Sequence, residues 1–130
     1  MRHIFVVGAL VTFILNASAL QAAQPQITKI DAKVRQSLLS KTSVRVLVRL
    51  NEPIKTQERL TPEEKQQQNA RITAAQDSLL RELDGVPHRI VRRYEIIPTF
   101  SMEIGVVALA ALERSPRVAR VYEVERLRGA

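Results

Sequence analysis

Few side chains in this sequence could carry out chemistry, and their spacing forms no catalytic constellation. The two histidines are His3 and His88, and the chain has no cysteine. Nucleophilic catalysis needs a serine or cysteine beside a base that a third group orients, and no local signature of this kind is present. His88 follows Val86-Pro87 at the start of a predicted strand, where a solvated turn histidine is the simpler interpretation. We therefore predict no catalytic residue and no enzymatic activity.

The carboxylates and glycines predict no bound group either. Glu63-Glu64 is expected at a helix N-terminus, where the helix dipole accounts for acids, and Glu123 and Glu125 occupy alternate positions of a predicted strand. One retained histidine and scattered acids give no metal-ligand spacing, and the glycines form no phosphate-binding loop. We predict no metal and no cofactor, so the function should be binding.

The beginning of the sequence has the three regions of a secretory signal peptide. Residues 1–3 are polar and basic, Ile4 to Leu15 is an uninterrupted apolar run, and small residues follow at 16–23. They allow cleavage after residue 19, or as late as residue 23. A membrane anchor is the alternative, but twelve apolar residues are fewer than the roughly 20 of a spanning helix. We predict a secreted or periplasmic protein that has no membrane contact after the signal is removed.

Removal of residues 1–19 leaves about 111 residues, which is enough for one domain with one core. Without cysteine, packing alone must stabilise that domain. The net charge is +7 for the whole chain, and loss of Arg2 leaves about +6, which favours an acidic partner. Nucleic acid is not expected, because the chain is exported and its aromatic residues do not cluster. We expect a monomer when no partner is bound.

Hydrophobic periodicity predicts a helix, then a strand, then a long helix. Within the lead segment 24–42, apolar residues recur at helical spacing up to about Ser40 (Ile27, Ile30, Val34 and Leu38), and strict alternation then indicates a strand (Val44, Val46, Val48 and Leu50). Thr61 and Glu64 form a capping box with Pro62 at the first helical position. The long helix buries one stripe (Ile72, Ala75, Leu79 and Leu83, supported by Leu80) and stops at Gly85, and we expect its polar turns, residues 66–69, to project into solvent.

The second half predicts two strands, a helix and a last strand. The strands are expected at 88–96 and 99–104, broken by Ile97-Pro98, the helix at 106–114, and the last strand at about 117–125. Val118 and Val121 are three residues apart, and a bulge would place both on one face. The order is β-α-β-β-α-β, which predicts an α+β, ferredoxin-like fold: a four-stranded antiparallel sheet with two helices on one face, preceded by an N-terminal amphipathic helix. The other face of the sheet should be open to a partner.

Four segments together resemble the propeptides of subtilisin-like serine proteases, a family that includes stand-alone peptidase inhibitors. They are Val44 to Leu50, Ile72 to Leu80, Val91 to Pro98 and Leu109 to Val118, in the family's order. The resemblance implies that residues 43–125 are a propeptide-like inhibitor domain whose open sheet face packs on two surface helices of the protease. It also implies that residues 126–130 are a tail lying in the active-site cleft like a cleaved product.

Carried over by position, Ala130 would fill the pocket before the scissile bond, Gly129 and Arg128 would lie extended, and Leu127 would fill an apolar pocket. The family usually carries adjacent acids directly after the apolar positions of the last strand, where they cap the protease's helices. This sequence offers only Glu123 in that run, so Glu123 is the candidate for this contact.

No protease domain follows Ala130 in this sequence, so we expect an inhibitor, a folding chaperone, or both, acting in trans on a subtilisin-like serine protease. Two alternatives stay open. One is a non-inhibitory envelope or extracellular module that uses the open sheet and its basic rim. The other is the remnant of a truncated protease precursor.

Overall fold

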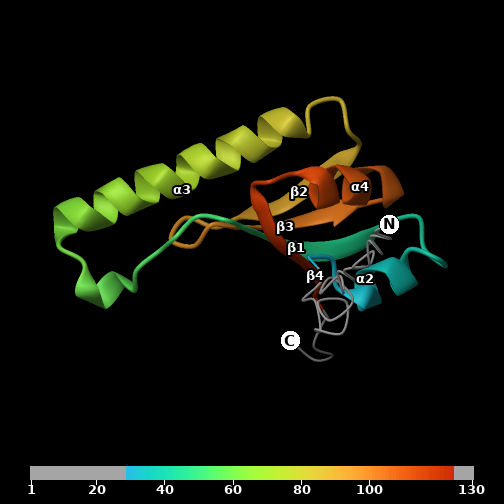
Figure 1. Ribbon diagram of the computed structural model, residues 1–130, viewed down its shortest axis with the longest axis horizontal. Coiled ribbons are helices and arrows are strands. Elements are labelled where there is room, and N and C mark those ends of the chain that lie inside the picture. Colours follow the sequence, from blue (N-terminus) through green and yellow to red (C-terminus); the bar gives the residue numbers. More distant parts are fainter. Residues whose placement is uncertain (1–28, 125–130) are drawn as a thin grey trace, which may run out of the picture.

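A computed structural model describes residues 29–124 (Figure 1). The predicted signal peptide, residues 1–19 or up to 23, and the predicted tail, residues 126–130, lie outside the described residues. The elements in chain order are α2 (Ala32–Ser37), β1 (Val44–Leu50), a short 3-10 helix η1 (Gln57–Arg59), α3 (Pro62–Glu82), β2 (His88–Arg93), β3 (Thr99–Ile104), α4 (Val106–Arg114) and β4 (Val118–Glu123).

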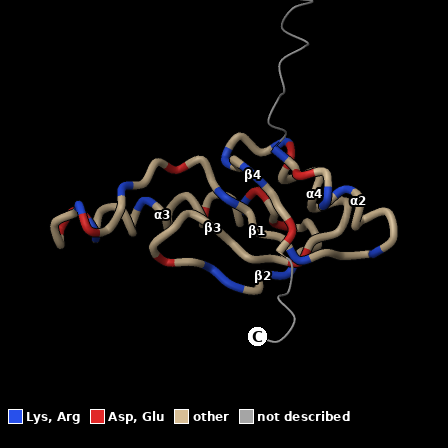
Figure 2. The backbone as a smooth tube through the Cα atoms, turned by 90° about the horizontal axis from the view of Figure 1, so that it is seen from below, with Lys and Arg blue, Asp and Glu red and all other residues tan. Residues whose placement is uncertain are grey.

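The four strands form one antiparallel sheet in the order β2-β3-β1-β4. Figure 2 shows β2 and β4 at its two edges. In this order β1 and β2 run parallel with β3 between them, which is the split arrangement of a ferredoxin-like fold. The predicted fold class is therefore confirmed.

One face of the sheet builds the hydrophobic core. Cross-strand pairs on β1 and β3 point the same way, and the pairs Val44–Ile104, Val46–Met102 and Val48–Phe100 are all buried. The helices cover this face with further buried residues (Val34, Leu79, Leu83, Ala108, Leu109 and Leu112). Full burial of each large apolar side chain contributes about 1.5–3 kcal/mol, so this one layer of contacts stabilises the fold.

The last strand contains the predicted bulge. Arg49 pairs with Arg120 and Leu50 pairs with Val118, which leaves Ala119 without a partner on β1. The extra residue lets Val118 and Val121 both face the core, where each is fully buried.

The long helix begins as predicted. Thr61 accepts a hydrogen bond from the Glu64 N–H, and the Glu64 side chain accepts one from the Thr61 N–H, both at 3.2 Å. The helix ends at Glu82, and Gly85 follows with φ +77°, a left-handed conformation that glycine adopts without strain.

The prediction that the polar turns of α3 project into solvent is only partly confirmed. The N-terminal half of α3 extends past the sheet together with the segment between β1 and α3, and the two form an arm, residues 51–71 (Figure 1). Gln68 does not project into solvent: it is 2% exposed. Its amide donates to the Lys55 carbonyl at 3.0 Å and accepts from the Lys55 N–H at 2.8 Å. The prediction was wrong for Gln68 because a glutamine side chain can both donate and accept hydrogen bonds, and here it satisfies the backbone groups of a loop residue.

The N-terminal helix is shorter than predicted, and Ile30 lies outside it. Ile30 forms a parallel bridge with Val121, with hydrogen bonds from the Asp31 N–H to the Val121 carbonyl and from the Val121 N–H to the Lys29 carbonyl. A sheet edge exposes unpaired backbone groups, and pairing them outweighs continuing the helical pattern. This segment therefore covers part of the β4 edge.

Candidate functional site

The core does not use the side of the sheet opposite the described helices, and we call this side the open face. Cross-strand register places three rows of side chains on it. They are Arg89, Glu103 and Arg45; then Arg92, Ser101, Leu47 and Tyr122; then Thr99, Arg49 and Arg120. Among the described strand residues this gives five arginines and one acid. In Figure 2 the Lys and Arg positions, in blue, mark both edges of the sheet.

In the first row one carboxylate serves two arginines. Arg89 lies on both oxygens of Glu103, with N···O distances of 3.0 and 2.6 Å, and Arg45 Nη2 lies 3.2 Å from Glu103 Oε1. The Arg89 guanidinium, and after it the Arg45 guanidinium, hold the pKa of Glu103 below its usual range. The row thus carries one net positive charge and ties β2, β3 and β1 together.

The middle row is the apolar centre of the open face. Leu47 and Tyr122 are half-buried neighbours on β1 and β4, although no helix of the described chain covers them. Ser101, between Leu47 and Arg92, is 7% exposed because the long side chains around it shield it. The Arg92 guanidinium stacks over Tyr94 at 4.8 Å from the ring centroid. An apolar centre within a basic frame suits a protein partner.

The third row opens into a hollow at the end of the sheet. The hollow has a volume of about 690 Å³, and Arg49, Thr99 and Tyr122 belong both to its lining and to the open face. We call it the end hollow.

Glu123, predicted as the protease-helix contact, does not lie on the open face. It pairs with Val46, whose side chain is in the core, and its carboxylate accepts a hydrogen bond of 2.7 Å from the Ser37 hydroxyl of α2. Strand alternation after the bulge explains this: Arg120 and Tyr122 point to the open face, so Glu123 points to the helix side. The open face therefore offers Arg120 and Tyr122, and not Glu123, at this end of β4.

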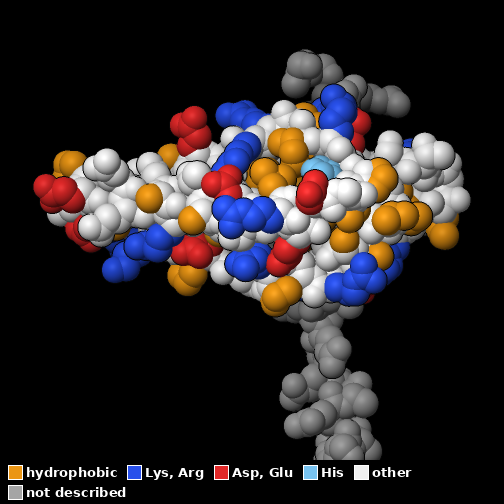
Figure 3. All heavy atoms as spheres, turned by 90° about the horizontal axis from the view of Figure 1, so that it is seen from above, with side chains coloured by type: hydrophobic (Ala, Val, Ile, Leu, Met, Phe, Trp, Pro, Cys, Tyr) orange, Lys and Arg blue, Asp and Glu red, His pale blue; other side chains and the backbone are white. Residues whose placement is uncertain are grey.

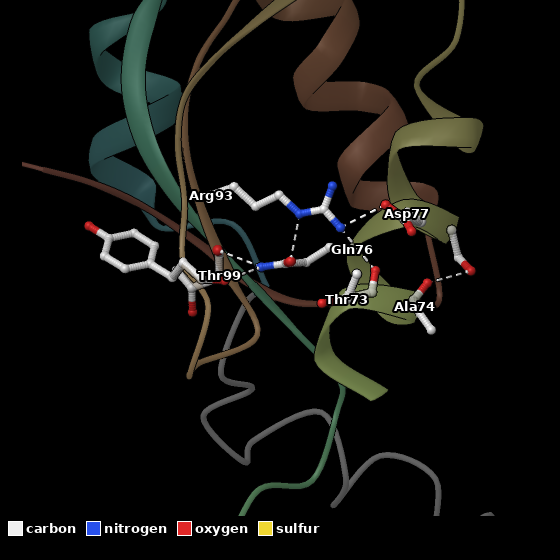
Figure 4. Close-up of polar contacts among 8 residues, drawn as sticks. Thr73, Ala74, Gln76, Asp77, Arg93 and Thr99 are labelled. Carbon is white, nitrogen blue, oxygen red and sulfur yellow. Dashed lines mark hydrogen bonds and ion pairs between the residues drawn. The ribbon is translucent and has the colours of Figure 1, made fainter. Parts of the chain in front are cut away.

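The scaffold of the site depends on a polar cluster that the sequence did not reveal (Figure 4). The Gln76 amide, 1% exposed, donates to the carbonyls of Tyr94 and Thr99 at 2.8 and 3.2 Å, and its oxygen accepts from Arg93 Nε at 2.7 Å. Arg93 also reaches Asp77 at 2.7 Å. The cluster ties α3 to the β2–β3 turn. A polar residue in the buried stripe of α3, at the i+4 position from Ile72, was its only signal.

An exposed apolar surface lies at the end opposite the arm, where Figure 3 shows hydrophobic side chains gathered. Leu39, Val106 and Val107 are 87%, 63% and 60% exposed. Two charges that line it, Arg35 and Glu113, pair with each other.

The remaining candidates from the sequence are the tail and His88. Leu127, Arg128, Gly129 and Ala130 lie outside the described residues. His88 Nδ1 lies 2.6 Å from the Val86 carbonyl oxygen. Within residues 29–124, no three His, Cys, Asp or Glu side chains come together as metal ligands would. In that same part of the chain no helix has the length and hydropathy to cross a bilayer.

Comparison of the whole chain with protein-family models gives no match, and comparison with curated proteins gives no match either.

Proposed function

We propose that this protein is an exported inhibitor of a subtilisin-like serine protease, acting in trans, and that it also assists folding of that protease. The open face docks on the protease surface, and residues Leu127–Ala130 lie in the active-site cleft like a product. Inhibition is by occupancy, without a covalent step.

One observation carries the proposal: a ferredoxin-like sheet keeps Leu47 and Tyr122 on a face that no described helix covers. Apolar side chains left on an uncovered sheet face of a small domain are a candidate interaction surface. The fold alone does not name the partner. The protease is chosen for the four segments that resemble the propeptide family.

The tail contributes extended backbone and two side chains to the proposed contact with the protease. Leu127 and Ala130 supply a large apolar and a small residue, and an extended peptide in a cleft gains strand-like hydrogen bonds as well as pocket contacts.

A second candidate function is favoured by the five arginines of the open face. In this function the protein is a non-inhibitory module that holds an acidic envelope or extracellular component. The two functions differ in their response to salt. A rise in ionic strength that shortens the Debye length from roughly 10 to 3 Å weakens contacts between exposed charges, whereas apolar burial and tail insertion persist.

The test is inhibition of a panel of bacterial subtilisins by the protein expressed from its full sequence, at low and high salt. Leu47→Asp should raise the inhibition constant about tenfold, which corresponds to about 1.4 kcal/mol. The matched control is Val107→Asp, an equally apolar surface position on α4, 60% exposed, which should leave the constant unchanged. Replacement of residues 127–130 by serine should also raise it about tenfold.

Two results would overturn the proposal. One is absence of inhibition across the panel at micromolar protein. The other is inhibition that Leu47→Asp and Val107→Asp impair equally. Binding to acidic surfaces that high salt abolishes, without inhibition, would support the second function instead.

A further inference from the structure

The end hollow is built from carbon-rich walls on two loops. Its apolar lining comes from Leu50 and the loop after β1 (Pro53 and Ile54), and from the β2–β3 turn (Ile97 and Pro98), with Ala119 of β4 contributing as well. Ile54 and Ile97 are 43% and 37% exposed, so both side chains are accessible from the hollow.

The bulge residue of β4 lines the hollow. Ala119 has no partner on β1, and it contributes a single methyl group to the lining. The walls are held in place: the Leu50 N–H donates to the Pro98 carbonyl at 2.8 Å, and Gln68 holds the loop at Lys55. The shape is therefore preformed, as in binding pockets of this size.

Charge distinguishes the rim of the hollow. Glu52, the acid among its described lining residues, faces Arg71 with an N···O distance of 3.6 Å. Arg49 is exposed, and no acid in residues 29–124 pairs with it. The hollow thus combines an apolar wall with one guanidinium that has no acid partner among residues 29–124.

We propose that the end hollow receives an apolar side chain of the partner protein, and that an Asp or Glu beside that side chain pairs with Arg49. A protein occupies it because Arg49, Thr99 and Tyr122 make the hollow continuous with the open face. A guanidinium binds a carboxylate in a directed, two-pronged geometry, so this pairing selects among partners. The identity of the partner as a protease rests on the proposed function, whereas the ligand chemistry does not.

The ligand chemistry is tested without a protease. Isocaproate, which joins a branched apolar group to a carboxylate, is titrated into the protein while amide chemical shifts are followed by NMR. Its shifts should centre on Ile97, Thr99 and Ala119, and isocaproamide and acetate should bind more weakly. Arg49→Gln should remove the preference for the acid over the amide, a loss of about threefold for an exposed pair. Shifts elsewhere, or equal binding of acid and amide, would overturn the proposal.

The partner is tested by filling the hollow. Ala119→Leu should raise the inhibition constant against a sensitive subtilisin about tenfold, and the matched control Ala74→Leu, at an exposed position of α3, should not. Thermal unfolding of both variants shows whether the fold is intact, and Arg49→Gln serves in place of Ala119→Leu if the latter unfolds.

The two tests can refute the two parts of the proposal independently. If isocaproate binds at the hollow while Ala119→Leu inhibits as well as the wild type, the protein does not use the hollow on its partner and that part is wrong. If no subtilisin is inhibited, the proposed function fails and the titration alone decides the ligand chemistry.

Discussion

Arg93 Nε lies 2.7 Å from the side-chain oxygen of Gln76, and this hydrogen bond joins β2 to α3 beneath the β2–β3 turn (Figure 4). The same glutamine donates to the Tyr94 and Thr99 carbonyls on the two sides of that turn. One buried side chain therefore holds the turn whose residues Ile97 and Pro98 wall the end hollow.

Gln76→Met should lower the free energy of unfolding by about 2–3 kcal/mol. Methionine keeps the volume of glutamine but removes the side-chain hydrogen bonds to Arg93 Nε and to the Tyr94 and Thr99 carbonyls, and buried groups that lose a partner are costly. Arg93 keeps Asp77, and the Thr99 carbonyl keeps the Tyr94 N–H. Denaturant unfolding followed by circular dichroism measures the change. Gln66→Met, at an exposed position of the same helix, should change stability by about 0.5 kcal/mol or less; equal losses in both variants would contradict the role of the cluster.

Gln68→Met should loosen the arm while leaving the sheet intact. The Lys55 N–H donates to the Gln68 side chain, and loss of that bond opens a region that few other contacts hold. Hydrogen exchange at the Lys55 amide should become about fivefold faster, by the usual value of about 1 kcal/mol for a hydrogen bond. Exchange at Val46 and Met102 in the sheet should not change, and neither should the Lys55 amide in the control Gln67→Met.

Arg89→Gln should raise the pKa of Glu103 back toward its ordinary value. The hydrogen bond from Arg89 is the main cause that lowers this pKa, and Arg45 comes second. Because the folded-state pKa is lowered, the stability that ionised Glu103 contributes is fully present above its unfolded-state pKa and is lost as the pH falls through the folded-state value. An NMR titration of the Glu103 side-chain carboxyl carbon measures the pKa in each variant.

Arg45→Gln should raise the Glu103 pKa less than Arg89→Gln does, and Arg81→Gln, on the exposed side of α3, should leave it unchanged. If Arg45→Gln raised the Glu103 pKa more than Arg89→Gln, Arg89 would not be the main cause of the lowered pKa.

Gly85→Ala should lower the free energy of unfolding by about 1 kcal/mol. The cause is the backbone conformation, φ +77°, because an added Cβ would meet no atom within 4 Å. Asparagine tolerates the left-handed region better than alanine, so Gly85→Asn should lose less. Thermal unfolding of the three proteins gives the order, and an alanine variant as stable as the wild type would contradict the conformational cause.

The fold could be predicted because its signals are local. Alternation from Val44 to Leu50, the capping box at Thr61 and Glu64, and Gly85 after the long helix each specify one element without reference to the rest of the chain. Even the bulge in β4 was visible, because Val118 and Val121 cannot share a face of a regular strand.

The candidate site was predicted only as a face, because its details depend on register. Strand pairing, which no local pattern specifies, decides which arginines share Glu103 and leaves Ala119 unpaired in the lining of the end hollow. Glu123 illustrates the limit: the family resemblance makes it a candidate for a partner contact, but only the strand register shows that it lies on the helix side against Ser37.

The sequence by itself determined the elements, their order and the alternation that leaves one sheet face without a helix, since these follow from periodicity and capping within short segments. The tertiary structure alone decided that Gln68 and Gln76 are buried, that Ile30 joins the sheet edge, and that Arg49 remains without an acid partner among residues 29–124. The physical reason is that a buried polar group, an unpaired strand edge and an exposed charge are each settled by residues far away in the chain, which meet only when the sheet has formed.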